Sequence, residues 1–246
     1  LPDTMPSRYV WVNLPGYYMQ LIQDDSVVIS SKIVCGKPIT RTPLLTSAIS
    51  NLVTYPQWTI PESIIVKEIL PGIKRDSNYL LKKGYSLIDS KGDEVDPHTV
   101  EWSKYKKGIP YKVVQGSGDE NALGILKFNF PNKYAVYLHD TNQRYLFSRS
   151  IRSLSHGCVR VQEWEKLAYN IVRYDNLEKY GDDRSPIEDS MTTWLRRKEK
   201  HIIPVRNKLP VYIRYFTCEG RGGELLVYED IYGEDKVLHQ KYFAGK

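Results

Sequence analysis

Hydrophobic and polar positions alternate along both ends of the chain. Near the start, the alternation runs over residues 9–14, and the apolar run 27–29 follows a polar turn at 23–25. Near the end, it returns over residues 211–216, and a glycine-rich turn at 219–223 leads to a further apolar run. A period of two residues is typical of strands that bury one face. The pattern therefore predicts β-strands at both ends of the chain and an opening β-hairpin.

Three interior segments are also predicted to be extended. Residues 49–60 end at a proline, which disfavours helix in the residue before it, and residues 159–161 form a short apolar run. Residues 134–138 are rich in strand-forming types and follow a Phe-Pro-Asn turn. This last strand would deliver His139 at its carboxyl end.

Helical spacing replaces the alternation within residues 61–110. Apolar residues over 64–70 repeat at helical intervals up to a Pro-Gly stop at 71–72, and residues 78–81 begin a second short helix that ends at Gly84. A Lys-Gly-Asp turn then separates two short strand-like runs. Because strand signals resume on both sides, the sequence predicts an insertion of about fifty partly helical residues within a β framework.

The clearest helix begins after residue 163. Its apolar residues recur at i, i+3, i+4, i+7 and i+8, and they are Trp164, Leu167, Ala168, Ile171 and Val172. Such a stripe is expected to pack in the core, and a shorter helix is expected around residues 189–198. The fold class is therefore mainly β with α insertions (α+β): one domain of residues 1–60 and 111–246, interrupted by a small subdomain at 61–110.

Composition excludes several classes of protein. The 246 residues are 41% hydrophobic and 12% aromatic, which supports a buried core and excludes collagen-like and low-complexity chains. No apolar run is long enough to span a membrane, and no signal segment opens the chain. Since the first residue is Leu1 rather than Met, we expect a processed product or an excised piece. Any membrane contact would then come through a missing N-terminal segment.

The charge balance is moderately basic. There are 35 Lys and Arg against 29 Asp and Glu, a formal net charge of +6. The basic residues are scattered, without a dense run interleaved with aromatics, so no nucleic-acid partner is expected. A basic exterior is compatible with an anionic polymer as partner.

Three cysteines leave at least one thiol unpaired within the chain. Cys35 and Cys218 both lie on predicted strands. We expect two separate buried thiols, with a disulfide between them as the alternative if the two backbones approach closely.

The third cysteine lies in the segment Ser155-His156-Gly157-Cys158-Val159-Arg160. A thiol is a nucleophile as its thiolate, and neighbouring donors or cations favour that form. A glycine allows close approach of a substrate backbone, and consecutive N–H groups in such a turn bind an oxyanion. The segment therefore indicates acyl transfer by Cys158.

A nucleophilic thiol also needs a base. His139 is the first candidate because it ends a predicted strand nineteen positions before Cys158, which leaves enough chain to return beside it. His156 is the rival base: in an extended strand it would share a face with Cys158, whereas in a tight turn its ring would serve structure. A zinc site built from these residues is disfavoured, because His-x-Cys is an unusual ligand spacing and no further ligand is near. No metal and no cofactor is expected.

These residues resemble the signature of the YkuD-type L,D-transpeptidase catalytic domain: His139, fifteen intervening residues, then Ser155-His156-Gly157-Cys158. The resemblance extends over essentially the whole chain and is strongest to the large periplasmic, YcbB-like subgroup. The segments that carry it are Tyr55-Pro56-Gln57-Trp58, Asn121-Ala122-Leu123-Gly124, Phe128-Asn129-Phe130-Pro131-Asn132, Tyr137-Leu138-His139-Asp140-Thr141 and Asp230-Ile231-Tyr232-Gly233.

The resemblance implies a β-sandwich core and a cysteine-dependent acyltransferase of peptidoglycan biosynthesis in the periplasm or cell envelope. Cys158 would attack the bond between diaminopimelate and D-alanine of a tetrapeptide stem. The thioester would then pass to an amine of a second stem, giving a 3→3 cross-link. The partners implied are donor and acceptor stem peptides, and the inhibitors implied are β-lactams of the carbapenem class. Residues 61–110 would cap the substrate cleft.

The resemblance also assigns roles. Cys158 is the nucleophile and His139 the base, oriented by the backbone carbonyl of Asp140, while His156, Gly157 and Cys158 supply oxyanion donors. The residues expected to bind substrate are Tyr137, Arg160, Ser155 and Trp58, and for Arg160 a bracing role within the loop is an equal alternative. Asp140 departs from the family, in which a small residue commonly follows the histidine.

Two other functions remain open from the sequence. The same Cys-His pair with water as acceptor gives an L,D-carboxypeptidase or an amidase-type hydrolase, since both reactions need the same base. A wall-binding module without catalysis is the non-enzymatic alternative, and it would be expected to lack the nucleophile or the base.

Overall fold

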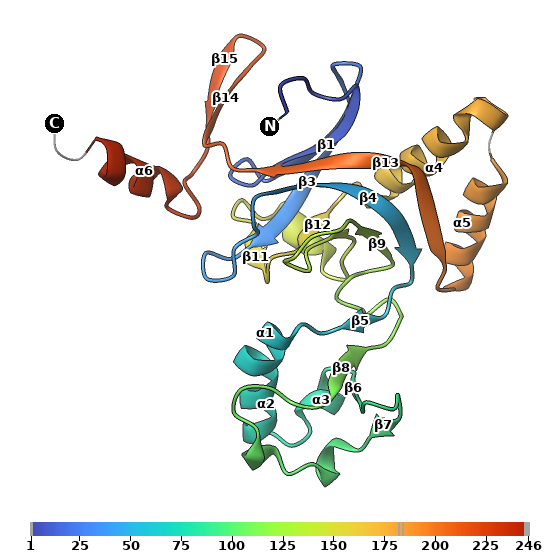
Figure 1. The fold of residues 1–246 in the computed structure, drawn as a ribbon, viewed down its shortest axis with the longest axis vertical. Coiled ribbons are helices and arrows are strands. Elements are labelled where there is room, and N and C mark those ends of the chain that lie inside the picture. The colour runs from blue at the N-terminus through green and yellow to red at the C-terminus, as the bar shows by residue number, and fades with distance from the viewer. Residues whose placement is uncertain (1, 182, 184, 244–246) are drawn as a thin grey trace.

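The computed structural model describes residues 2–181, 183 and 185–243. Leu1 lies outside the described residues. The main body is a nine-stranded sheet in the order β11-β3-β12-β10-β9-β4-β13-β1-β2. Because β2 also pairs with β3, the strands from β3 to β2 form a closed circuit, with β11 attached at its edge. Figure 1 shows this body above a smaller lobe. The expected β-rich fold with helices is confirmed.

The strands of the body have these bounds: β1 Arg8–Asn13, β2 Tyr18–Gln23, β3 Ser26–Gly36, β4 Leu45–Thr54, β9 Leu126–Asn129, β10 Leu138–His139, β11 Ser153–Ser155, β12 Val159–Val161 and β13 Ile202–Arg214. The first three form antiparallel neighbours, as the opening alternation predicts. Asp24 and Asp25 both have positive φ in the turn between β2 and β3, the backbone that a two-residue hairpin turn requires.

The core lies inside the circuit of strands. Val10, Val12 and Leu14 are fully buried, as the alternation in β1 predicts. Helix α4 (Trp164–Tyr180) packs against β13, and all five residues of its predicted apolar stripe are buried. Helix α5 (Pro186–Arg197) follows and packs beside α4, and both helices lie at one side of the body (Figure 1).

The smaller lobe contains the insertion. It consists of α1 (Glu62–Ile64), the π-helical turn η1 (Ile65–Ile69), α2 (Leu70–Arg75), α3 (Tyr79–Lys82) and a sheet of order β5-β8-β6-β7, with β5 Trp58–Thr59, β6 Tyr85–Ile88, β7 Glu94–Val95 and β8 Lys112–Gln115. The described residues also contain three 3₁₀ turns: Pro97–Thr99 and Trp102–Lys104 in the lobe, and Arg144–Ser148 in the body. Since β5 and β8 lie outside 61–110, the structural unit is wider than the predicted insertion. It has its own hydrophobic cluster.

The predicted helix stop at residues 71–72 is wrong. The helix continues through Pro71 and Gly72 to Arg75. Immediately before the proline, the Leu70 N–H donates to Ile65 O, five residues back. Pro71 has no N–H to donate, and this wide π-helical turn carries the helix past the missing hydrogen bond.

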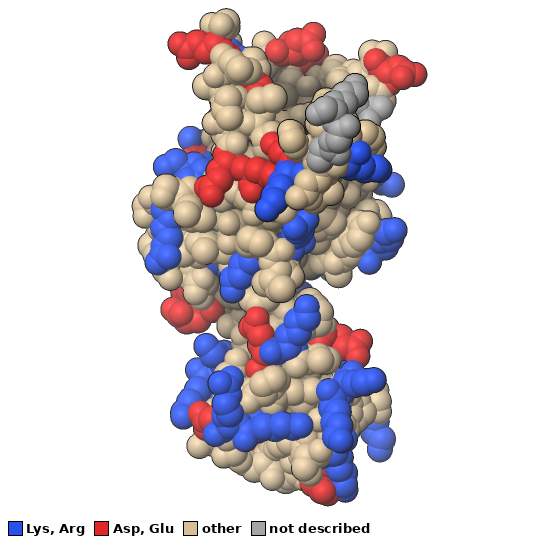
Figure 2. Space-filling view, turned by 90° about the vertical axis from the view of Figure 1, so that its left-hand side faces the viewer, with Lys and Arg blue, Asp and Glu red and all other residues tan. Residues whose placement is uncertain are grey.

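The C-terminal part projects from the body. Strands β14 (Cys218–Arg221) and β15 (Glu224–Val227) form the predicted hairpin, and α6 (Glu234–Tyr242) extends beyond it (Figure 1). Figure 2 shows the narrow waist between body and lobe, with Lys and Arg side chains spread over the lobe. Within the described ranges, no helix has the length and apolar character needed to cross a membrane.

Candidate active site

Cys158 and His139 meet where β10 and β12 run side by side. The two strands are parallel, with Leu138 opposite Val159 and His139 opposite Arg160. Cys158 immediately precedes β12, and the next residue, Val159, donates its N–H to Tyr137 O at 3.1 Å. The predicted nucleophile and base therefore lie at neighbouring strands in the interior of the sheet. Both line a pocket of about 100 Å³ between body and lobe.

The segment leading to His139 differs from the prediction. Only Leu138 and His139 are a strand, whereas residues 134–137 are not. The Asn132 side chain accepts from the N–H groups of Tyr134 and Val136, and Ala135 has φ +54°. A side chain that captures backbone groups competes with a strand ladder, so the β-forming residue types here form a loop that is held by Asn132.

The Cys158 sulfur is half-buried, and it donates to Ala135 O at 3.8 Å. Burial raises the pKa of this thiol, because desolvation disfavours the thiolate. Hydrogen bonding to Tyr137 and the charges of Lys127 and Arg160 oppose that rise in the pKa. No described hydrogen bond joins the sulfur to a His139 ring nitrogen. At rest the cysteine is therefore a thiol.

His139 is buried, and its ring orientation is fixed. Nδ1 forms a short hydrogen bond to Asp140 O, and because a carbonyl only accepts, Nδ1 carries the proton. Burial, reinforced by the charge of Arg160, lowers the pKa of His139 to about 3. The imidazole is therefore neutral near pH 7, with Nε2 as its unprotonated nitrogen. Hydrogen bonding to the carbonyls of Asp140 and Leu123 partly offsets this lowering of the His139 pKa. Both carbonyls would stabilise the imidazolium that forms when His139 accepts a proton.

Asp140, the residue that departs from the family pattern, is anchored by its carboxylate. The carboxylate accepts from Arg144 at 2.9 Å and from the Ile125 N–H at 3.1 Å. Gly124 makes room for it: a Cβ there would stand 2.3 Å from Asp140 Oδ2, and φ at Gly124 is +64°. Anchoring Asp140 in this way fixes the carbonyl that orients His139.

The loop before the nucleophile is held from inside by Ser155. Its hydroxyl donates to Cys158 O at 2.6 Å and accepts from the Gly157 N–H at 3.2 Å. Gly157 has φ +123°, a backbone that side chains rarely adopt. Ser155 lines the pocket, but its hydroxyl braces the turn. The Gly157 N–H is engaged there, while the N–H groups of His156 and Cys158 have no described partner.

The His156 ring lies away from the sulfur. Its Nε2 forms a short hydrogen bond to Glu68 Oε1 in the lobe. A ring held by Glu68 favours the alternative in which His156 serves structure. His139 is the histidine that remains as candidate base.

Arg160 lies opposite His139 in β12. One guanidinium nitrogen donates to Gln143 Oε1 at 2.9 Å, whereas Nε is buried without a partner among the described residues. Desolvation lowers the pKa of Arg160. The side chain lines both the Cys158 pocket and a neighbouring hollow of about 570 Å³, so it is braced by Gln143 and faces both spaces.

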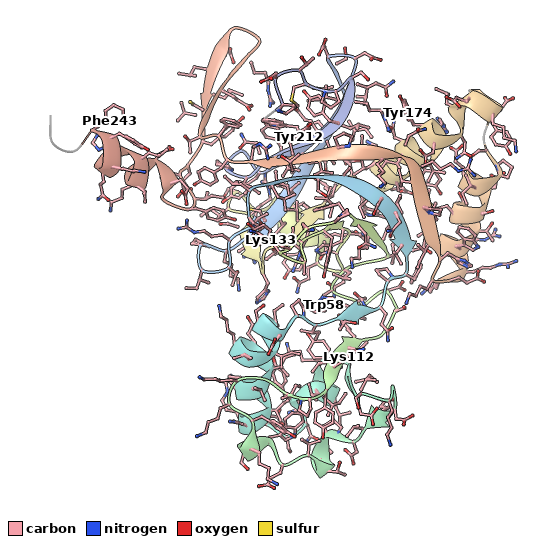
Figure 3. The ribbon with its side chains drawn as sticks, viewed as in Figure 1. Trp58, Lys112, Lys133, Tyr174, Tyr212 and Phe243 are labelled. Carbon is pink, nitrogen blue, oxygen red and sulfur yellow. The ribbon has the colours of Figure 1, made fainter. Side chains whose placement is uncertain are left out.

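Trp58 and Tyr137 form walls of the pocket, and Figure 3 shows Trp58 at the junction of lobe and body. The rings of Tyr137 and His139 meet edge to face, with centroids 5.6 Å apart. Burial raises the pKa of Tyr137, so its hydroxyl remains protonated. Tyr137 is placed beside His139 by the loop that Asn132 holds.

Lys127 was missed by the sequence analysis. It pairs with His139 across β9 and β10, and its Nζ lies 3.9 Å from the centroid of the Tyr137 ring. Its positive charge favours the Cys158 thiolate. The available signal was a lysine between two apolar residues, Leu126 and Phe128, on a strand.

The other two cysteines are not joined in a disulfide. Cys35 is buried, and burial raises the pKa of its thiol to about 12, which keeps it unreactive. Cys218 is exposed, so its expected burial is wrong: the hairpin that carries it stands clear of the core. Among the described residues, no three His, Cys, Asp or Glu side chains gather as metal ligands.

Comparison with known proteins identifies the class. The family model of the YkuD L,D-transpeptidase catalytic domain matches residues 7–198. The chain belongs to this family, an enzyme class with a sheet-rich core.

A protein of Haemophilus influenzae (strain ATCC 51907 / DSM 11121 / KW20 / Rd) named "Putative L,D-transpeptidase" is 36% identical over 230 residues. The alignment covers 94% of this chain and 45% of that protein, so the chain spans less than half of its relative.

Solved structures include an L,D-transpeptidase from Mycobacterium smegmatis, at 12% identity and TM-score 0.37, covering 85% of this chain and 58% of that one. Another is the catalytic domain from E. faecium L,D-transpeptidase acylated by ertapenem, at 14% identity and TM-score 0.36. It covers 86% of this chain and 100% of that one.

Proposed function

We propose that the protein is a cysteine-dependent peptidoglycan L,D-transpeptidase that forms 3→3 cross-links. The observation that carries this proposal is that His139, fixed through Nδ1 to Asp140 O, lines the same pocket as Cys158. A base needs an unprotonated nitrogen, and the Nδ1 contact leaves Nε2 in that form. The family to which the chain belongs supports the reaction type.

In the first half-reaction, Cys158 Sγ attacks the carbonyl carbon of the bond between diaminopimelate and D-alanine. His139 Nε2 takes the thiol proton as the C–S bond forms, because the resting pair is thiol and neutral imidazole. The imidazolium then gives that proton to the departing D-alanine amine as the C–N bond breaks. The products are free D-alanine and a thioester on Cys158, so atoms and charge balance.

The tetrahedral intermediate needs donors for its oxyanion. The N–H of Cys158 is the first of these, and the His156 N–H is the second, since both lack described partners. The Gly157 N–H donates to Ser155 Oγ and would have to leave it to join them. Such donors, already in place before reaction, stabilise charge as it develops.

The second half-reaction transfers the acyl group to an amine of another stem. His139 takes a proton from the attacking amine as the C–N bond forms, and the imidazolium gives that proton to the thiolate that leaves as the C–S bond breaks. The hollow beside the pocket is the place for that stem: it shares Ala122 and Arg160 with the pocket, and Lys82 and Lys83 line it. Stem peptides carry carboxylates, so cationic side chains there suit their ends.

An L,D-carboxypeptidase or amidase-type hydrolase is the second candidate. The hollow is large enough to admit water, and the same base would activate it. A wall-binding module is disfavoured because the nucleophile and the base are both present.

Cross-links form between stem peptides of assembled peptidoglycan, so this function implies the periplasm or cell envelope of a bacterium. Carbapenems, the inhibitors that the family resemblance implies, are proposed to acylate Cys158.

The test incubates the protein with purified tetrapeptide stems and analyses products by mass, alongside the Cys158→Ala variant. Dimers that lack one D-alanine support transfer, and tripeptides alone support hydrolysis. Unchanged products from Cys158→Ala would refute Cys158 as nucleophile. A carbapenem adduct on the intact protein, absent from Cys158→Ala, is the expected second readout.

A further inference from the structure

Among the described residues, one side-chain hydrogen bond joins residues 61–110 to the active-site loop. Of all hydrogen bonds described, the bond between Glu68 Oε1 and His156 Nε2 is the one that joins residues 61–110 to the chain beyond residue 116. Its two side chains come from positions 88 residues apart in the sequence. The contact therefore connects the insertion with the residue two positions before the nucleophile.

Glu68 projects from an unusual helical turn. It lies in the π-helical turn Ile65–Ile69, between a helix that begins at Glu62 and the proline at position 71. Ile65 and Ile69 are buried in the lobe's own hydrophobic cluster, which fixes the turn, while Glu68 is exposed on its other side. A π-helical turn displaces the following residues around the axis and is frequent at functional sites.

His156 is the outer support of the loop. From inside, Ser155 holds the turn through Gly157 N–H and Cys158 O. From outside, Thr40 Oγ1 donates to Ser155 O at 3.1 Å, and Glu68 contacts the His156 ring. The N–H groups proposed as oxyanion donors belong to His156 and Cys158, on either side of Gly157. Their direction therefore depends on both supports.

We propose that Glu68 is a positioning residue for acylation: through His156 Nε2 it orients the loop whose N–H groups receive the oxyanion, and it holds the lobe over the pocket. Glu68 touches no reacting atom. This inference rests on the proposed function, in which Cys158 becomes acylated. The expected consequence is a slower chemical step with little change in the affinity for the acylating ligand.

The experiment measures acylation of the whole chain by a carbapenem, with the rate constant and the half-saturating concentration determined separately. Glu68→Ala is expected to lower the rate constant roughly fivefold, as loss of an exposed charged contact allows, and to leave the half-saturating concentration nearly unchanged. Glu68→Gln, whose amide oxygen still accepts from the His156 ring N–H, should restore most of the rate. Lys67→Ala is the matched control, because this exposed neighbour on the same turn has no described contact.

A second comparison separates positioning from folding. In a His156→Ala background, Glu68→Ala should slow acylation no further, since its partner is already lost. An equal slowing in both backgrounds would overturn the proposal, as would a Glu68→Ala protein that is acylated at the rate of the unaltered one.

Hydrogen exchange measured without ligand tests the role of Glu68 independently of the proposed function. In Glu68→Ala the amides of residues 155–158 should exchange about fivefold faster than in the unaltered protein, with Lys67→Ala unchanged. Exchange that is equal in all three proteins refutes the role of Glu68. Failure of the unaltered protein to be acylated refutes the proposed function instead.

Discussion

At the scale of single residues, the site depends on two groups that are both neutral at rest. Burial raises the pKa of Cys158 and lowers that of His139. A thiolate–imidazolium pair is therefore disfavoured before substrate binds. Instead, the hydrogen bond from His139 Nδ1 to Asp140 O leaves Nε2 as the nitrogen that accepts the thiol proton.

Replacing His139 by glutamine tests this role. The glutamine fills a similar space but takes no proton, so we expect the acylation rate to fall by about 10²–10⁴, the usual contribution of a general base. Mass measurement of the carbapenem adduct over time checks it. A small thiol reagent should still modify Cys158 in the variant, which shows that the sulfur remains accessible, and acylation at an unchanged rate would refute His139 as base.

The pH dependence of acylation follows from the same two groups. The reacting form is thiol plus neutral imidazole, and it persists from above the lowered pKa of His139, about 3, to below the raised pKa of Cys158. We therefore expect a rate constant that is flat from about pH 5 to 8. An inflection near pH 6.5, the usual range of histidine, would show that His139 titrates normally and would contradict its burial.

At the scale of elements, β10, the strand that carries His139, is held by a close approach between the Gly124 backbone and the Asp140 side chain. Gly124 lies against Asp140, where a Cβ would stand 2.3 Å from the carboxylate oxygen. The anchoring contacts of Asp140 with Arg144 and Ile125 depend on that space. Orientation of His139 is thus set by the loop before β9 as well as by β10 itself.

Gly124→Ala should therefore destabilise the fold by about 2–4 kcal/mol, since it combines a steric clash with an unfavourable φ. Gly84→Ala is the control: Gly84 has φ +63°, similar to the +64° of Gly124, but no atom lies within 4 Å of the position that a Cβ would take there. It should lose only about 1 kcal/mol. Urea unfolding of both variants measures the difference, and equal losses would show that the contact with Asp140 adds nothing.

Sequence patterns predict the elements whose own residues determine them. The stripe of α4 and the alternation of β1 are both buried as expected, because each faces one continuous core. Residues 134–137 were predicted wrongly since the Asn132 side chain, rather than residue propensity, decides their backbone. The nucleophile and the base were predictable from spacing, whereas the contacts of Lys127 and Glu68 arise from tertiary neighbours that no local pattern encodes.

At the scale of the whole molecule, lobe and body enclose two adjoining spaces. The Cys158 pocket lies on one side of Arg160 and the larger hollow on the other. Lys82 is paired with Asp76 at 2.7 Å, whereas Lys83 is exposed and has no described ionic partner. Lys83 is therefore the cation from the lobe that an incoming carboxylate would meet in the hollow.

Lys83→Ala should change the outcome of the reaction rather than its first step. With tetrapeptide stems, the dimer is expected to decrease about threefold relative to tripeptide, because an exposed charge contact contributes up to about 1 kcal/mol to binding of the second stem. Formation of the thioester on Cys158 should keep its rate. Lys91→Ala is the matched control, since Lys91 is an exposed lysine of the same lobe that does not line the hollow.

The ratio of dimer to tripeptide, measured by mass at low and high salt, decides the role of Lys83. Added salt screens exposed charges, so it should reduce the dimer fraction of the unaltered protein toward that of Lys83→Ala and leave the variant nearly unaffected. If the two proteins respond to salt alike, the second stem does not meet Lys83. The hollow would then be a route for water, and the hydrolytic alternative would gain the support that transfer loses.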